Sequence, residues 1–151
     1  GNAPPIGSNA FDALSPFATI NVPIEATGFD EAALGQPLLI IAGPLRYQIR
    51  GDIASVAGFE DSVTGRVKIL ESVQGASVTA IGNNALERCS DISEIIIPES
   101  VTEIARRAFR DCTGLETVRI PDSITRIEEE AFSGCTALKN LTLGEAILAP
   151  K

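Results

Sequence analysis

One 23-residue unit occurs three times in succession in this chain, at residues 78–100, 101–123 and 124–146, with no gap between the copies. Eight columns of this alignment are apolar in every copy. They are Val78/Val101/Ile124, Ile81/Ile104/Ile127, Ala85/Ala108/Ala131, Leu86/Phe109/Phe132, Cys89/Cys112/Cys135, Ile92/Leu115/Leu138, Ile95/Val118/Leu141 and Ile97/Ile120/Leu143. A fixed period of about 20 to 50 residues predicts a solenoid, because one short unit cannot bury its apolar face alone and must stack on its neighbours.

The spacing of the apolar residues changes along each unit. In "LETVRIP" (115–121) apolar and polar residues alternate until a proline, which predicts a half-buried strand. In "IARRAFRDC" (104–112) the apolar residues are three or four apart, which predicts one or two helical turns. "SVTEI" (100–104) is expected to be a short extended connection. We therefore expect an α/β solenoid, a right-handed coil with a parallel β-sheet on one face and short helical turns on the other.

The pattern "L..V.IP.SVT.I...AF..C..L" resembles the BspA-like leucine-rich repeat, a bacterial variant found in secreted and cell-surface proteins. The resemblance covers residues 78–146. The departures are Leu86 in place of Phe, Ala105 and Glu128 in place of Gly, and Gly144 in place of Pro. The resemblance implies an extracellular or cell-surface location and adhesion to a protein or glycan, with host extracellular matrix among the candidates.

A degenerate fourth unit is expected in residues 1–36, where "ATINVP" reads as a strand and "GFDEAAL" as a short helix. Residues 37–77 interrupt the repeat and read as an inserted β-rich junction or cap. In this segment "LRYQI" and "IASVAGF" predict strands around the turn "RGD", and "GRVKILESV" restates "EIIIPESV" in a register that aligns Arg66 with Glu94. With a tail at 147–151, residues 1–151 are expected to form a single domain.

The carboxyl end lacks a covering segment of this kind. Leu138, Leu141 and Leu143 would lie on a terminal coil with an open edge. Exposed parallel edges attract another strand, so we expect self-association or a longer chain.

Composition argues against several functional classes. Twelve basic and twenty acidic side chains give a net charge of -8, which repels a phosphate backbone, so nucleic-acid binding is not expected. The chain has no His, so a Ser or Cys nucleophile would lack its usual base. The acidic stretches Glu128–Glu130 and Glu60–Asp61 are next to predicted turns, where carboxylates face solvent. We expect no enzyme and no cofactor.

The longest apolar run, residues 37–45, is interrupted by Gly43 and Pro44 and is too short to cross a membrane. We read it as a buried strand.

Three cysteines are evenly spaced, one in each copy of the unit and at the same position of the repeat. Neither a CxxC pair nor any other short ligand spacing accompanies them, so no metal site is expected. Parallel side chains on adjacent coils point the same way, which disfavours a disulfide. The three thiols are expected to form a column of small buried side chains that react slowly.

Two short motifs are weak evidence of a function. "RGD" (50–52) matches an integrin-binding tripeptide and is also explained by a hairpin turn that uses Gly51. "NLT" (140–142) matches a glycosylation sequon but falls in a predicted strand.

Two columns of outward-facing residues remain on the predicted sheet. One would hold Thr19, Arg66, Glu94, Thr117 and Asn140, and the other Asn21, Lys68, Ile96, Arg119 and Thr142. Solenoids often bind other macromolecules through such a surface, so Arg66, Lys68, Glu94, Ile96, Thr117, Arg119, Asn140 and Thr142 are the candidate ligand-binding residues. The alternative is ordinary solvent-facing polarity on a structural spacer or stalk within a larger surface protein.

Overall fold

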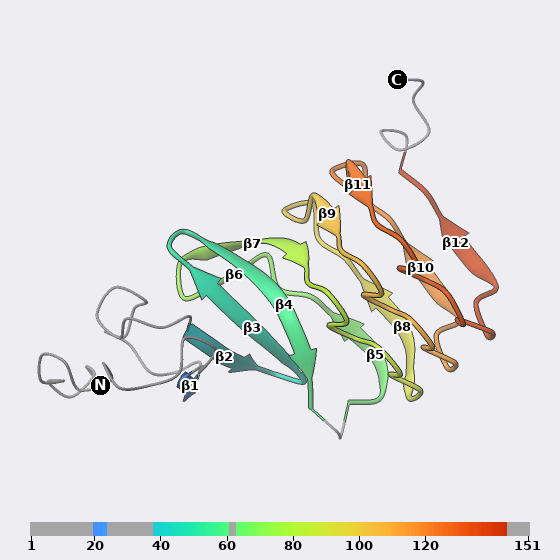
Figure 1. Cartoon of the computed structure of the whole chain (residues 1–151), viewed down its shortest axis with the longest axis horizontal. Coiled ribbons are helices and arrows are strands. Elements are labelled where there is room, and N and C mark those ends of the chain that lie inside the picture. The colour runs from blue at the N-terminus through green and yellow to red at the C-terminus, as the bar shows by residue number, and fades with distance from the viewer. Residues whose placement is uncertain (1–19, 24–37, 61–62, 145–151) are drawn as a thin grey trace, which may run out of the picture.

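The computed structural model describes residues 20–23, 38–60 and 63–144, and within them every regular element is a strand (Figure 1). The strands are β1 (Ile20–Pro23), β2 (Leu38–Ala42), β3 (Leu45–Arg50), β4 (Ile53–Phe59), β5 (Gly65–Lys68), β6 (Ser72–Val73), β7 (Ala76–Ile81), β8 (Ile92–Ile96), β9 (Glu103–Ile104), β10 (Thr117–Arg119), β11 (Arg126–Ile127) and β12 (Asn140–Thr142).

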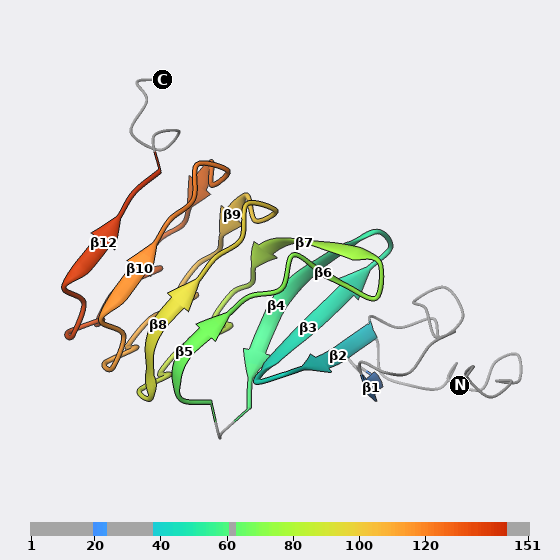
Figure 2. The ribbon, with the colours of Figure 1, turned by 180° about the vertical axis from the view of Figure 1, so that it is seen from behind.

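One side of the solenoid is a four-stranded parallel sheet of β5, β8, β10 and β12, which lie side by side in Figure 2. Val118 lies opposite Ile95 on one neighbour and opposite Leu141 on the other, so the register advances by one repeat unit per strand. Val67 of β5 lies opposite Ile95 of β8, and Arg66 lies opposite Glu94, as the alignment of "GRVKILESV" with "EIIIPESV" predicted. The alignment of the sequence with itself therefore predicted the register of this sheet.

A second sheet runs along another side of the coils and was not predicted. The "SVTEI" segment, expected to be a connection, contributes β9, and its equivalents contribute β7 and β11. Ala80 lies opposite Glu103, and Glu103 lies opposite Arg126, so this sheet also advances by one repeat unit per strand. The sheet then continues toward the N-terminus through β4, β3, β2 and β1, with β4 parallel to β7.

The predicted helical turns are not confirmed, because the described residues contain no helix. Residues 83–88 and 106–111 are turns instead. Two positions in each unit have left-handed backbone, which an α-helix does not tolerate. One position is Asn84, Arg107 and Glu130 with φ of 56°, 58° and 58°, and the other is Arg88, Asp111 and Gly134 with φ of 63°, 57° and 77°.

Backbone hydrogen bonds between coils explain why the turn conformation is retained. The N–H groups of Arg107, Phe109 and Asp111 donate to the carbonyls of Glu129, Ala131 and Ser133, at 3.1, 2.8 and 2.7 Å. Residues 84, 86 and 88 donate to 106, 108 and 110 in the same way. An α-helix would use these N–H groups within one coil, whereas the turns direct every second one to the next coil.

The apolar columns fill the space between the two sheets and the turns. Phe109 and Phe132 stack with ring centroids 5.0 Å apart and planes 6° apart, and Leu86 precedes them in the same column. Phe109 is 1% exposed, whereas Phe132 on the last coil is only partly buried. The rung-over-rung stacking inferred from the repeat is therefore confirmed.

The β3–β4 hairpin lies beside the first coil and adds to its core. Tyr47 of β3 is fully buried, and its hydroxyl accepts a hydrogen bond of 3.0 Å from the Leu70 backbone N–H. Burial raises the pKa of Tyr47 above its usual value. The strands predicted on either side of "RGD" are thus present as β3 and β4.

The N-terminal part differs from the prediction in one respect. β1 pairs with β2, and Asn21 lies opposite Leu39, so Asn21 does not extend the column of Lys68. β1 is therefore part of the second sheet and not of the four-stranded sheet. Thr19 and the predicted helix at 28–34 lie outside the described residues.

At the opposite end, β12 pairs with β10 and with no other strand among the described residues. Leu141 and Leu143 are 44% and 36% exposed, whereas the equivalent Val118 and Ile120 are fully buried. In each earlier coil the next coil covers these apolar positions. In the last coil described they are exposed.

The stacked phenylalanines provide a test of the shared core. Phe109→Ala is expected to lower the free energy of unfolding by about 3–5 kcal/mol, because it opens a cavity between two coils. Phe132→Ala should cost clearly less, since Phe132 is only partly buried, whereas Phe109 is packed between Leu86 and Phe132. Urea unfolding of both variants measures the difference in the free energy of unfolding. Equal losses would contradict a column of stacked side chains that is fully covered at Phe109 and only partly covered at Phe132.

Candidate functional site: a hollow on the four-stranded sheet

The structure brings the eight predicted ligand-binding residues together in two rows across the four-stranded sheet. Arg66, Glu94, Thr117 and Asn140 share one register position, and Lys68, Ile96, Arg119 and Thr142 share the other. Their side chains are exposed or half-buried, whereas Val67, Ile95 and Val118 between them are buried. The period-two pattern of each strand produces this separation.

In the first row, the charges of Arg66 and Glu94 neutralise each other. The Arg66 guanidinium donates two hydrogen bonds to the Glu94 carboxylate, of 2.7 Å from Nε and 3.1 Å from Nη2. The hydrogen bond to Arg66 lowers the pKa of Glu94, and the same bond raises the pKa of Arg66. This pair links β5 to β8 and leaves neither group free to attract a charged ligand.

The second row is charged differently. Lys68 and Arg119 lie on either side of Ile96, one strand away from it in each direction. Since strands are about 4.8 Å apart, the two cationic residues are roughly 10 Å apart along the sheet. Neither forms an ion pair with any residue in the described part of the chain. This row presents two unpaired positive charges around an apolar centre.

A hollow of about 400 Å³ lies over the carboxyl ends of these strands. Lys68, Glu94, Ile96 and Arg119 from the prediction line it. The lining residues that were not predicted to bind a ligand are Glu71, Ile95, Ile97, Pro98, Glu99 and Pro121. A smaller hollow of about 70 Å³ continues from it past Arg119 to Thr142. Arg66, Thr117 and Asn140 line neither hollow.

The "IPES" and "IPDS" strings were the available signal for the missed residues. They place Pro98 and Pro121 at the same point of successive coils, two residues after the end of β8 and of β10. Proline cannot continue the ladder of hydrogen bonds, so the chain leaves the sheet there. The resulting step forms one wall of the hollow, together with the exposed Glu99.

Another hollow, of about 360 Å³, lies near the turns and is less suited to a ligand. Its charged residues already pair with one another. Arg126 Nη2 is 2.5 Å from Glu128 Oε1, and the Arg106 backbone N–H donates to Glu128 Oε2 at 2.9 Å. Arg106 also lies 3.9 Å from Glu129. Binding here would require these contacts to break.

The comparison with known families decides the classification. Residues 66–149, more than half of the chain, match the BspA type leucine rich repeat region in six copies. The chain belongs to the BspA-type leucine-rich repeat family. No curated protein matches it closely.

Solved structures contain the same repeat fold. A leucine-rich repeat protein from Bacteroides ovatus is 31% identical over 70% of this chain, with a TM-score of 0.64, and the match spans 30% of that protein. A leucine-rich repeat protein from T. pallidum is 23% identical over 69% of this chain, with a TM-score of 0.64 and 49% of that protein matched. A third, from Bacteroides capillosus, is 23% identical with a TM-score of 0.54, over 70% of this chain and 97% of that one. The chain thus spans less than half of the first two proteins.

The acidic stretches of this BspA-type chain are engaged in ion pairs. Glu130 receives two hydrogen bonds of 3.0 Å from Arg107, and these bonds lower the pKa of Glu130. Glu60 lies 3.4 Å from Arg46, and Asp61 is outside the described residues. Among described residues, no cluster of three or more Cys, Asp or Glu could hold a metal, and no helix could span a membrane. Glu130 thus links two neighbouring coils, whereas Glu60 pairs with an arginine of the β3–β4 hairpin.

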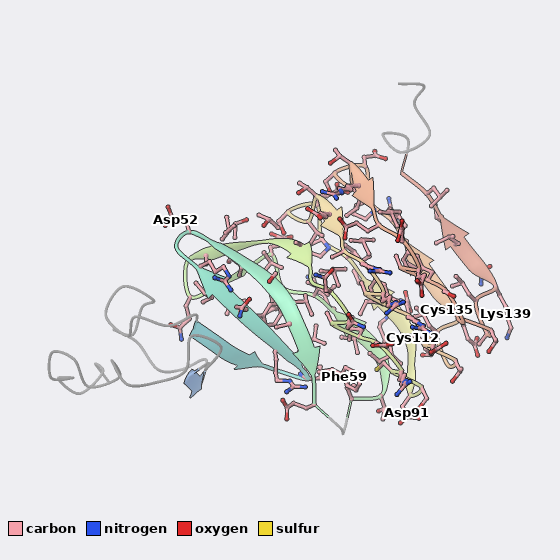
Figure 3. The ribbon with its side chains drawn as sticks, in the orientation of Figure 1. Asp52, Phe59, Asp91, Cys112, Cys135 and Lys139 are labelled. Carbon is pink, nitrogen blue, oxygen red and sulfur yellow. The ribbon has the colours of Figure 1, made fainter. Side chains whose placement is uncertain are left out.

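The three thiols of the BspA-type repeat stack in a column, as Figure 3 shows for Cys112 and Cys135. Cys112 Sγ donates to the Leu86 carbonyl at 2.9 Å, and Cys135 Sγ donates to the Phe109 carbonyl at 3.1 Å. Burial raises the pKa of Cys89 to about 11. The neighbouring Cys135 thiol, together with burial, raises the pKa of Cys112, and the neighbouring Cys112 thiol lowers the pKa of Cys135. Cys112 and Cys135 thus each bond their coil to the previous one.

The thiols are expected to differ in reactivity. Only a thiolate is nucleophilic, so Cys135, which is half-buried and has the lowered pKa, should be alkylated first in the native protein. Cys89 and Cys112 should remain unmodified until the coils unfold. Iodoacetamide labelling at pH 8 followed by peptide mass spectrometry gives the order, with labelling in guanidinium chloride as the control. Native Cys112 reacting as fast as Cys135 would contradict the buried column.

Proposed function

We propose that this chain is a non-enzymatic binding module that recognises an acidic segment of another macromolecule across its four-stranded sheet. The observation that supports the proposal is the row of Lys68, Ile96 and Arg119. Two cations without ion-pair partners flank an apolar side chain at the edge of a hollow of about 400 Å³. Such a row matches carboxylate or sulfate groups roughly 10 Å apart with an apolar group between them.

The surroundings of this row favour a protein ligand over a glycan. Glu71 and Glu99 also line the hollow, so the surface has charges of both signs and would select a ligand with a matching arrangement. Ile96 and the two prolines give an apolar floor that suits an aliphatic side chain. An acidic glycan remains the second candidate, because its charged groups could also meet Lys68 and Arg119.

The family supports a location at the bacterial surface or outside the cell. Within that setting the module would act in adhesion, and extracellular matrix proteins of a host are one source of acidic ligands. The alternative is a structural spacer that separates other domains of a longer surface protein. A spacer requires the stacked coils but places no demand on the charges of the sheet face.

Charge reversal separates these two functions. Lys68→Glu and Arg119→Glu are expected to weaken binding to an acidic ligand about tenfold or more each, because repulsion replaces attraction. Both side chains are exposed and unpaired, so the melting temperature should stay unchanged. Arg88→Glu, which reverses an exposed cation in a turn, is the matched control. Surface plasmon resonance over an immobilised matrix-protein panel measures the effect, and unaltered binding by both variants would remove the sheet face from the proposal.

We further propose that the open edge at β12 can bind a second copy of the chain. Parallel edges with unpaired backbone groups add strands readily, and Leu141 and Leu143 supply exposed apolar area. Leu141→Lys should shift the chain toward the monomer, because a charge at the edge would be buried on association. Multi-angle light scattering across a concentration series measures the mass, and a monodisperse monomer for the unaltered chain would refute this contact.

A further inference from the structure

The tip of the β3–β4 hairpin is a second exposed surface, separate from the four-stranded sheet. It consists of Arg50, Gly51, Asp52 and Ile53, all of them exposed. Ile53 is 53% exposed, the most of any large apolar residue in the described part of the chain. Figure 3 shows Asp52 at the far end of the hairpin, away from β8, β10 and β12. A cation, an anion and an apolar side chain thus occur together at one protruding point.

The two charges at this tip are available to a partner. Arg50 and Asp52 form no ion pair with each other or with any other residue that the structure describes. Arg66, Arg107 and Arg126 are paired with glutamates, whereas Arg50, like Arg88 and Arg119, has no ion pair among the described residues. The hairpin therefore presents a guanidinium and a carboxylate, separated by one glycine, without a charged neighbour among the described residues to neutralise either.

The backbone beneath the tip is held on both sides. Arg50 lies opposite Ile53 across the hairpin, so Gly51 and Asp52 are the two loop residues. Gly51 has a φ of 59°, as the first central residue of a type II′ turn requires. The Asp52 carbonyl accepts a hydrogen bond of 2.9 Å from the Ser77 N–H of β7. Because β4 pairs with both β3 and β7, the tip is pre-organised, and binding would cost little ordering entropy.

We propose that this tip is a binding site for a metal-containing receptor of the integrin class, read through Arg50 and Asp52. A guanidinium matches a receptor carboxylate through paired hydrogen bonds, and an unpaired carboxylate is a strong ligand for a divalent cation held by the receptor. Ile53 adds apolar contact directly beside the carboxylate. The arrangement differs from that of an RGD string within a paired strand, where the side chains are held against neighbours.

The test uses the whole chain, immobilised, and the ectodomain of an RGD-binding integrin in buffer that contains Mn²⁺. The unaltered chain should bind, and EDTA or a short soluble RGD peptide should abolish binding. Asp52→Glu keeps the charge but moves the carboxylate by one methylene, so it should weaken binding at least about tenfold. Arg50→Lys should also weaken it, because a lysine lacks the paired donors. Asp91→Glu makes the same chemical change at another exposed aspartate and should have no effect.

The outcomes distinguish this site from the sheet face. The double variant with Lys68→Glu and Arg119→Glu should bind the integrin as well as the unaltered chain does. Absence of binding by the unaltered chain would overturn the proposal, as would binding that survives Asp52→Glu or EDTA. Circular dichroism and thermal melts of each variant exclude unfolding as the reason for a loss. Success or failure of integrin binding would leave the expectation for acidic ligands on the four-stranded sheet unchanged.

Discussion

The hydrogen bonds between coils are the constraint on which the rest of this structure depends. Each coil places the same backbone groups at the same height as its neighbour, on the four-stranded sheet, on the second sheet and along the turns. Within a strand of a parallel ladder, one extra residue would turn an inward side chain outward, so a change of unit length has to fall outside the paired strands of that sheet, as it does between β5 and β8. The constant register of the strand residues follows from this requirement, and so do the stacked columns of Phe and Cys.

The sequence predicted the parts of the fold that the inward columns determine. The alternation of apolar and polar residues around Val118 identified the strands of the four-stranded sheet. The alignment of "GRVKILESV" with "EIIIPESV" placed Arg66 opposite Glu94. The two rows of the sheet face followed directly, since every second residue of a strand faces outward. Conclusions drawn from equivalent positions were therefore correct for the strands of residues 66–142, which the family match also covers, whereas the same argument assigned Asn21 to the wrong sheet.

The conformation of the turns between the strands was not predicted correctly. Apolar residues three or four apart are typical of a helix, but successive turns with left-handed residues satisfy the same spacing. Asn84, Asp111 and Gly134 occupy left-handed positions and belong to the residue types that favour them, whereas Arg107 and Glu130 give no such signal. Contacts between coils determine the conformation here, and local propensity does not reveal them. The hollow was missed for a related reason, since its walls come from loops that follow different strands.

The same constraint is compatible with the two binding surfaces that we propose. Stability resides in inward side chains and in backbone groups, so outward residues such as Lys68 and Arg119 are not required for folding. Each coil adds one residue to each outward row, and neighbouring residues of a row are far apart in sequence but a strand apart in space. The hairpin tip is anchored through backbone contacts to β7, which leaves the side chains of Arg50 and Asp52 equally unconstrained. Substitution at the sheet face and at the tip can therefore alter these two surfaces while the stacked coils stay as they are.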